Sequence, residues 1–200
     1  MPFALVVPVK TLTRAKSRLT GFPDDVRRDL VSAFALDAVA AAMSCADVSS
    51  VAVVTDEPDL AGLARGLGCE VVPDEGAGDL NRALHHAVLA LCPGGPVAAM
   101  LGDLPCLRPG DLEQALRAVQ GKAFVADADG TGTTLVAVRD PASFATHFGP
   151  ASRSAHLAAG MAEITLELPS LRRDVDTADD LAAARSLGVG PRTTAVLAGT

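Results

Sequence analysis

The chain has 200 residues, a length that suits one α/β domain and is short for two. Its formal net charge is −7 and it contains no Trp or Tyr, so we expect no nucleic-acid partner, which would need positive charge and aromatic stacking surfaces. No apolar run approaches the roughly 18 residues of a membrane helix, and the first apolar run is too short for a signal segment. We therefore expect a cytoplasmic protein with no membrane partner.

Strand-like and helix-like segments alternate over the first 120 residues. Continuous apolar runs predict strands at 3–9, 48–55, 69–73 and 96–101. Apolar residues at helical spacing predict helices at 23–44, 58–68, 78–92 and 108–121. Buried strands joined by helical crossovers are typical of a parallel sheet that is covered on both faces.

The pattern changes in the C-terminal part of the chain. Segments 122–130 and 131–138 read as two strands joined directly by a Gly-rich turn, as in a hairpin. After them we expect a short helical segment from Pro141, a helix at 149–160, a strand at 163–168, a helix at 174–188 and a loose tail. We predict a single α/β domain over 1–190, with a mostly parallel central sheet and helices on both faces, and a C-terminal tail over 191–200.

One acidic site is predicted in "VAAMLGDLPCL", residues 97–107. Asp103 follows a buried strand and stands between a glycine and a proline. Open parallel sheets bind their ligands beyond the carboxyl ends of the strands, which is where Asp103 is expected to lie. Mg²⁺ takes one or two protein carboxylates and completes its shell with water and phosphate oxygens. Asp103 is therefore a candidate metal ligand; the alternative is an ordinary turn aspartate.

A second acidic site is predicted in "DVDTADDL", residues 174–181. Thr177 and Asp180 have the spacing of a helix N-cap with an acid in the first turn. That structural role leaves Asp174 and Asp176 unexplained, and alternate residues of an extended segment share one face. Either aspartate is a candidate second metal ligand.

Positive charge is concentrated near the N-terminus of this acidic chain. Four cations fall within "VKTLTRAKSRL", at Lys10, Arg14, Lys16 and Arg18. Together with two carboxylate sites, such a loop suggests a site for Mg²⁺ and a nucleoside triphosphate. The alternative is a solvated basic loop on the surface.

Three further segments have features of anion or nucleotide sites. The turn "DGTGTT", residues 129–134, offers backbone N–H groups and hydroxyls, and "FGPASRSAH" places Gly149, Ser152 and Arg153 at a helix start. Gly78 and Asn81, before and within a predicted helix, are candidates for the nucleotide base and ribose. The alternatives are a hairpin turn, a Ser-capped helix and a plain loop.

We assign no catalytic role to the four histidines, because no Ser–His–Asp or H-E-x-x-H pattern is present. A phosphate monoester, whose second pKa is about 6, is already a dianion at neutral pH. Transfer of a nucleotidyl group to such an acceptor needs no general base, so catalysis would consist of orientation and charge neutralisation.

Five blocks in sequence carry a family resemblance: "VPVKTLTRAKSRL", "LGDLPCL", "DGTGTTL", "FGPASRSAH" and "DVDTADDL". They resemble the guanylyltransferase family of coenzyme F-420 biosynthesis, which is similar to the molybdenum-cofactor and sugar nucleotidyltransferases and has a GT-A-like fold. The resemblance covers about residues 3–187. The chain lacks the L-x-G-G-x-G-x-R loop of the sugar nucleotidyltransferases after the first strand.

The resemblance implies transfer of GMP from GTP to a phosphorylated three-carbon acid, with release of pyrophosphate, and we expect Mg²⁺ as cofactor. Whether the labile product is handed directly to the next enzyme of the pathway is left open by the sequence. Phosphoenolpyruvate is the acceptor in actinobacterial members and 2-phospho-L-lactate in archaeal ones; the Ala- and Arg-rich, Lys-poor composition favours phosphoenolpyruvate. The open alternatives are a molybdopterin or sugar-phosphate nucleotidyltransferase and a non-catalytic nucleotide-binding protein.

The resemblance also implies roles for individual residues. Asp103 and either Asp174 or Asp176 match metal ligands. Thr134, Gly149 and Ser152 match positions that hold the phosphate and carboxylate of the acceptor. The triphosphate and its transfer would be served by Lys10, Lys16 and Arg18 together with Asp103.

Overall fold

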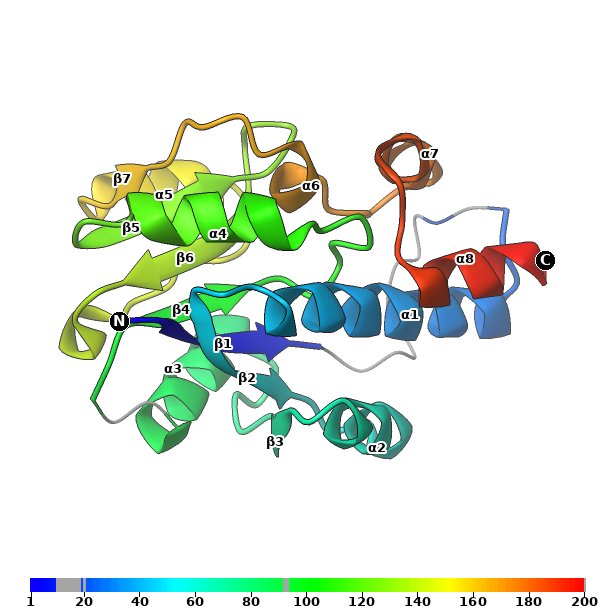
Figure 1. Ribbon diagram of the computed structural model, residues 1–200, viewed down its shortest axis with the longest axis horizontal. Helices are drawn as coiled ribbons and strands as arrows, with labels where there is room; N and C mark the ends of the chain where they lie inside the picture. The colour runs from blue at the N-terminus through cyan, green and yellow to red at the C-terminus, as the bar shows by residue number, and fades with distance from the viewer. Residues whose placement is uncertain (10–18, 20, 92–93, 200) are drawn as a thin grey trace.

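The computed structural model describes residues 1–9, 19, 21–91 and 94–199, and it contains one seven-stranded sheet in the order β3-β2-β1-β4-β6-β5-β7 (Figure 1). The strands are β1 (Phe3–Pro8), β2 (Val48–Val54), β3 (Glu70–Val72), β4 (Val97–Met100), β5 (Lys122–Ala126), β6 (Thr133–Val138) and β7 (Ala162–Glu163). The helices are α1 (Asp24–Met43), α2 (Pro58–Gly66), α3 (Leu80–Leu91), α4 (Pro109–Ala118), α5 (Ser152–Ala158), α6 (Pro169–Arg172), α7 (Ala178–Leu187) and α8 (Pro191–Ala198), with a short 3₁₀ helix at Pro141–Ser143.

Four strand pairs are parallel and two are antiparallel. The parallel pairs are β1–β2, β1–β4, β2–β3 and β5–β7. The antiparallel strand β6 pairs with both β4 and β5. The predicted mostly parallel sheet and the predicted hairpin are both confirmed, and the hairpin joins the strands β3-β2-β1-β4 to β7.

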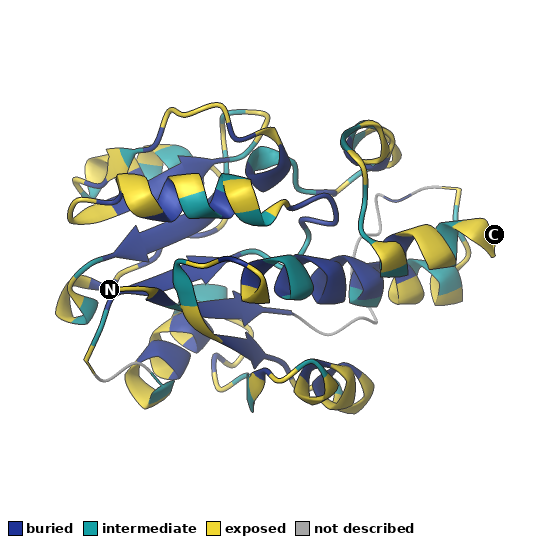
Figure 2. Ribbon diagram, viewed as in Figure 1, coloured by how far each residue is buried: buried dark blue, intermediate teal, exposed yellow. Residues whose placement is uncertain are grey.

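Helices cover both faces of the sheet, as alternate strand residues require (Figure 1). On one face Leu5 and Val7 of β1 belong to a core that contains residues of α1, α2 and α4. On the other face Val6 belongs to a core built with α3 and with Phe144 and Phe148. The burial pattern in Figure 2 follows this arrangement, with buried strands between helices whose outer sides are exposed. No helix within the described ranges is both long and apolar enough to cross a bilayer.

Two expectations for the C-terminal part were wrong. The strand predicted at 163–168 is limited to β7. The Arg172 guanidinium donates hydrogen bonds to the carbonyl oxygens of Ile164 and Leu166, at 2.6 and 3.2 Å, so these oxygens are bound by a side chain and not by a neighbouring strand. The loose tail is a helix, α8, over Pro191–Ala198. Its first N–H groups are bound by Asp37 of α1: Arg192 N and Thr193 N donate to the carboxylate at 3.1 and 2.8 Å.

Candidate active site

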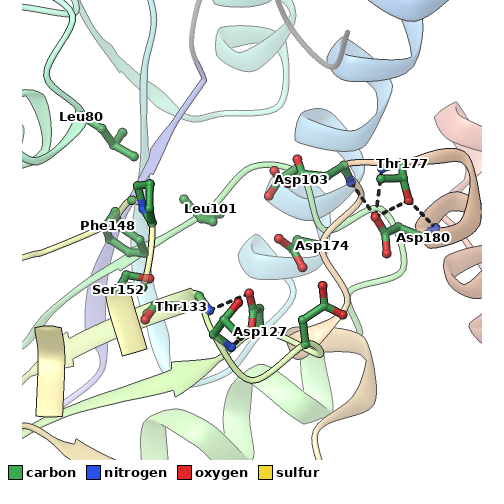
Figure 3. A pocket seen from close by; sticks show the side chains of 17 residues that line it. Leu80, Leu101, Asp103, Asp127, Thr133, Phe148, Ser152, Asp174, Thr177 and Asp180 are labelled. Carbon is green, nitrogen blue, oxygen red and sulfur yellow. Dashed lines mark hydrogen bonds between the residues drawn. The ribbon is translucent and has the colours of Figure 1, made fainter. Parts of the chain in front are cut away.

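A cavity of about 620 Å³ lies beyond the carboxyl end of β4 (Figure 3). It is lined by the loop after β4, the β5–β6 turn, the segment before α5 and the segment before α7. The lining residues that carry polar side chains are Asp103, Asp127, Asp129, Thr131, Thr133, Ser152, Asp174, Asp176, Thr177 and Asp180. The predicted acidic sites therefore lie on one cavity, although they are far apart in the chain.

Asp103 is delivered to the cavity by a close approach of two strands. A Cβ at Gly102 would lie 3.2 Å from Val9 Cγ2 and 3.4 Å from the Pro8 carbonyl oxygen, so the loop after β4 packs tightly against the end of β1. The next two side chains that follow the carboxylate, Leu104 and Pro105, are buried. This packing explains why the apolar strand ends in a glycine immediately before the aspartate.

The second acidic segment lies beside the first. The backbone N–H of Val175 donates to the carbonyl oxygen of Asp103 at 3.0 Å. Val175 is fully buried, whereas Asp174 is half-buried and Asp176 exposed on the cavity. In Figure 3 the side chains of Asp103 and Asp174 both face the cavity from the same end. The two candidate ligand segments are thus fixed to each other through the backbone.

Asp180 has a structural role in this segment. It forms a capping box with Thr177, and Arg173 Nη1 lies 3.2 Å from its Oδ1. Burial raises the pKa of Asp180, but the hydrogen bonds from Thr177 and Asp176 and the charge of Arg173 outweigh it, so the pKa lies below its ordinary value. The predicted N-cap is confirmed.

The Gly-rich turn between β5 and β6 binds a carboxylate of its own. Thr131 N and Gly132 N donate to the two oxygens of Asp127 at 2.9 and 2.8 Å. These two N–H groups are therefore bound within the chain, and an anion site formed by the other groups of the turn stays a prediction. Asp127 was not predicted as part of this site; it lies two residues before the turn at 129–134 and accepts from N–H groups four and five positions further along the chain.

The other end of the cavity carries hydroxyl groups and backbone. Ser152 is 1% exposed and Gly149, at φ +136°, lies in a conformation that favours glycine. Thr133 lines the cavity, at a bulge in the β5–β6 pairing. Thr134 is fully buried and does not line it, and its Oγ1 has no hydrogen-bond partner in the described parts of the chain.

Behind Thr133 lies His156, which is fully buried. Its Nδ1 is 3.0 Å from Thr133 Oγ1, and its Nε2 accepts from the backbone N–H of His147 at 2.9 Å. Burial, and to a lesser extent the nearby His147, lowers the pKa of His156 to about 4. The sequence predicted no role for this histidine, because it has no catalytic partner at a recognisable spacing.

Two candidate binding residues have structural partners instead. Asn81 bonds the backbone of Phe148 with both ends of its amide, at 3.0 and 2.8 Å, and so fixes the loop that carries Gly149. Arg153 binds the Glu163 carboxylate at 3.0 Å and the Gly130 carbonyl at 3.2 Å. Neither side chain lines the cavity.

The remaining predicted residues divide into two groups. Gly78 lies in the loop before α3 at φ +89°, outside the cavity lining. The basic cluster, with Lys10, Lys16 and Arg18, lies outside the described residues. Among the described lining residues there is no Lys, Arg or His.

Within the described ranges, no group of three or more His, Cys, Asp or Glu side chains is arranged to hold a metal ion by itself. Two carboxylates remain chemically suited to Mg²⁺, which commonly binds one or two protein carboxylates together with water and substrate phosphate. Asp103 and Asp174 supply such a donor pair on the cavity. The absence of nitrogen and sulfur donors from this pair also suits a hard cation.

A family model described as "Guanylyl transferase CofC like" matches residues 3–194. The chain is 51% identical over 204 residues to the phosphoenolpyruvate guanylyltransferase of Thermomonospora curvata, which covers 99% of this chain and 90% of that protein. It is 49% identical to the phosphoenolpyruvate guanylyltransferase of Streptomyces coelicolor, with 99% of this chain and 97% of that protein covered.

Solved structures with the same fold are more distant in sequence. A nucleotidyl transferase from Methanothermobacter thermautotrophicus superposes with a TM-score of 0.66 at 18% identity, over 92% of this chain and 96% of that one. A 4-diphosphocytidyl-2C-methyl-D-erythritol synthase from Anaerococcus prevotii gives 0.61 at 13% identity, over 92% and 95%. These likenesses confirm the predicted nucleotidyltransferase fold.

Proposed function

The chain belongs to the CofC-like guanylyl transferase family, and from this premise we propose that it transfers GMP from GTP to phosphoenolpyruvate in coenzyme F-420 biosynthesis. The observation that carries the proposal is the near-complete alignment, at about half identity, with relatives named for this reaction. The products are enolpyruvyl-diphospho-guanosine and pyrophosphate. GTP and phosphoenolpyruvate are cytoplasmic metabolites, so we expect the reaction to take place there.

The chemistry is a substitution at phosphorus. An oxygen of the acceptor phosphate forms a bond to the α-phosphorus of GTP, the bond from that phosphorus to the bridging oxygen breaks, and pyrophosphate leaves. The acceptor phosphate is already ionised at neutral pH. The protein therefore has to orient two anions and reduce their mutual repulsion, and needs no base at this step.

The acidic end of the cavity suits this task only together with cations. Six aspartates line the described part of the cavity, and both substrates are strongly negative. We propose that Asp103 and Asp174 hold Mg²⁺, which when bound neutralises charge on the α-phosphate and on the leaving pyrophosphate. Asp176, exposed beside Asp174, would bind metal-bound water. Lys10, Lys16 and Arg18 are proposed to bind the triphosphate.

The hydroxyl end suits the acceptor acid. Ser152 and Gly149 both line the cavity, and Ser152 lies away from the carboxylate pair (Figure 3). Gly149 and Ser152 are proposed as acceptor contacts on the cavity, with Asn81 and Arg153 holding the surrounding loops in place. Thr134 is proposed as a third contact on the family resemblance alone, because its side chain is buried and does not line the cavity. Transfer of the product directly to the next enzyme is also proposed, since a mixed diphosphate of an enol is labile.

The test is an acceptor panel. The purified protein is incubated with GTP, Mg²⁺ and one of phosphoenolpyruvate, 2-phospho-L-lactate or glucose 1-phosphate, and pyrophosphate and product mass are measured. We expect the highest kcat/KM with phosphoenolpyruvate. Release of pyrophosphate with 2-phospho-L-lactate alone would reassign the acceptor, and release with the sugar phosphate alone would overturn the proposal.

A further inference from the structure

We infer that His156 is a positioning residue, which turns the Thr133 hydroxyl into a fixed hydrogen-bond donor for an anionic oxygen of the acceptor acid. The inference rests on the proposed function for the identity of that acid. The hydrogen-bond geometry stands independently of it.

The direction of each hydrogen bond follows from the groups involved. A backbone N–H can only donate, so the His147 N–H at 2.9 Å requires a lone pair on His156 Nε2. A neutral imidazole with a free Nε2 carries its proton on Nδ1. Nδ1–H then donates to Thr133 Oγ1 at 3.0 Å.

The ring stays neutral because of its surroundings. His156 is fully buried, and its ring lies 5.4 Å from that of Phe124 and 5.7 Å from that of Phe148. The other titratable ring beside it is that of His147, at 5.5 Å. Burial and then this neighbour lower the pKa to about 4 and outweigh a backbone hydrogen bond to Ser152, which raises it, so the ring stays neutral at physiological pH.

The hydrogen bond from His156 determines where the Thr133 hydroxyl proton can point. A hydroxyl has one hydrogen to donate, and Thr133 Oγ1 already accepts the His156 proton. In the described ranges, no second protein group is bonded to this hydroxyl. Thr133 is 3% exposed and lines the cavity, so its remaining direction for donation is toward a ligand there.

The partner that fits is a carboxylate or phosphate oxygen, which can only accept. Ser152, 1% exposed, supplies a second hydroxyl at the same end of the cavity (Figure 3). The GTP phosphates are assigned to the opposite, metal-binding end by the proposed function. The Thr133 donor should therefore contribute to acceptor binding and leave GTP binding unchanged.

The tautomer is measured directly on the free protein. Long-range ¹H–¹⁵N spectra of labelled protein should show His156 protonated on Nδ1 and unprotonated on Nε2, between about pH 6 and 8. A proton on Nε2 in the free protein, or a doubly protonated ring at neutral pH, would overturn the inference. Neither result depends on whether phosphoenolpyruvate is the substrate.

Kinetics then test the role. Thr133→Val and His156→Phe should each raise the KM for the acceptor about tenfold or more, with the KM for GTP within about twofold, because each loses a hydrogen bond to a charged ligand. The double variant should be no worse than the single ones, since both remove the same donor. Thr133→Ser should keep most of the affinity.

Two further variants separate positioning from general damage. Thr193→Val makes the same change at a fully buried threonine of α8, away from the cavity, and should leave both KM values unchanged. His156→Asn keeps a donor near the Nδ1 position and should retain part of the affinity for the acceptor. This variant takes the place of His156→Phe if His156→Phe does not fold. An unchanged acceptor KM in Thr133→Val, or equal rises in both KM values, would reject the role. If the acceptor assay identifies an acid other than phosphoenolpyruvate as the substrate, the KM for that acid is measured in these variants.

Discussion

The backbone N–H of Val175 donates to the carbonyl oxygen of Asp103 at 3.0 Å, and this bond joins two segments that lie far apart in the chain. Val175 is fully buried in a cluster with Leu30, Phe34 and Leu181, so the bond is anchored from behind by α1 and α7. The side chains on either side of Val175 are consequently held at the cavity. The acidic pair is preorganised by the protein and does not need to be assembled by a ligand.

Removing either charge of the pair should remove turnover. Asp103→Asn and Asp174→Asn keep the size of the side chain but weaken a hard-cation ligand, so we expect kcat to fall about 100-fold or more. Asp179→Asn is the matched control, because Asp179 is exposed in the first turn of α7 and does not line the cavity. Normal turnover by Asp103→Asn would refute the metal assignment; melting curves would establish that each variant is folded.

Removal of divalent cations should have the same effect as these substitutions. Pyrophosphate release should stop in excess chelator and return on addition of Mg²⁺, because two carboxylates and two anionic substrates cannot share the cavity without a cation. Mn²⁺ binding in the presence of GTP, followed by electron paramagnetic resonance, should weaken in Asp174→Asn relative to the wild type. Full activity in chelator would contradict a metal-dependent mechanism.

Asp180 gives a pH-dependent prediction for stability. Its pKa is lowered in the folded state, so its contribution is present above the unfolded value of about 3.9 and is lost as pH falls through the lower folded value. Asp180→Asn should therefore destabilise the fold by about 1 kcal/mol at pH 7, the usual worth of a helix cap. The difference from wild type in urea unfolding should shrink below about pH 4. A difference that stays constant from pH 7 to 3 would mean that the carboxylate charge plays no part.

Much of the fold was predictable from local pattern. The strand runs at 3–9 and 96–101 and the helical spacing at 23–44 reflect burial that the sequence periodicity records directly. The position of Asp103 followed from a rule about parallel sheets, which holds whatever the surrounding side chains are. Its neighbour at the same end of the cavity, Asp174, was predicted together with Asp176, because an extended segment presents both on one face.

The features that the sequence did not predict depend on contacts with residues distant in the chain. Arg153 was predicted to bind an anion, and in the structure its guanidinium binds the carboxylate of Glu163, across the α5–β7 connection. The helix α8 was read as a tail because its N-terminus has no capping side chain of its own and is bound by Asp37 of α1. Local propensity cannot reveal a cap that another helix supplies.

Gly132 tests the self-bound turn. A Cβ at this position would overlap the Asp127 carboxylate, which accepts from the backbone of Thr131 and Gly132. Gly132→Ala should therefore break this arrangement and destabilise the protein by about 1 kcal/mol, the usual net contribution of a hydrogen bond that is lost from half-buried groups. Gly62→Ala is the control: it lies within α2 with open space around its Cβ and should be neutral or slightly stabilising. Equal urea midpoints for the two variants would contradict this account of the turn.

The Asp37 carboxylate of α1 should stabilise the N-terminus of α8 and hold this helix on the domain. The side chain is 5% exposed and accepts from Thr193 N at 2.8 Å, so Asp37→Ala leaves the N-terminal N–H groups of α8 without a cap. We expect a loss of about 1–2 kcal/mol in unfolding free energy and faster amide exchange over 191–198, with exchange in the sheet little changed. Asp29→Asn, an exposed change on the same helix, should alter neither. If exchange in α8 were as fast in the wild type as in Asp37→Ala, the segment would behave as the tail that the sequence predicted.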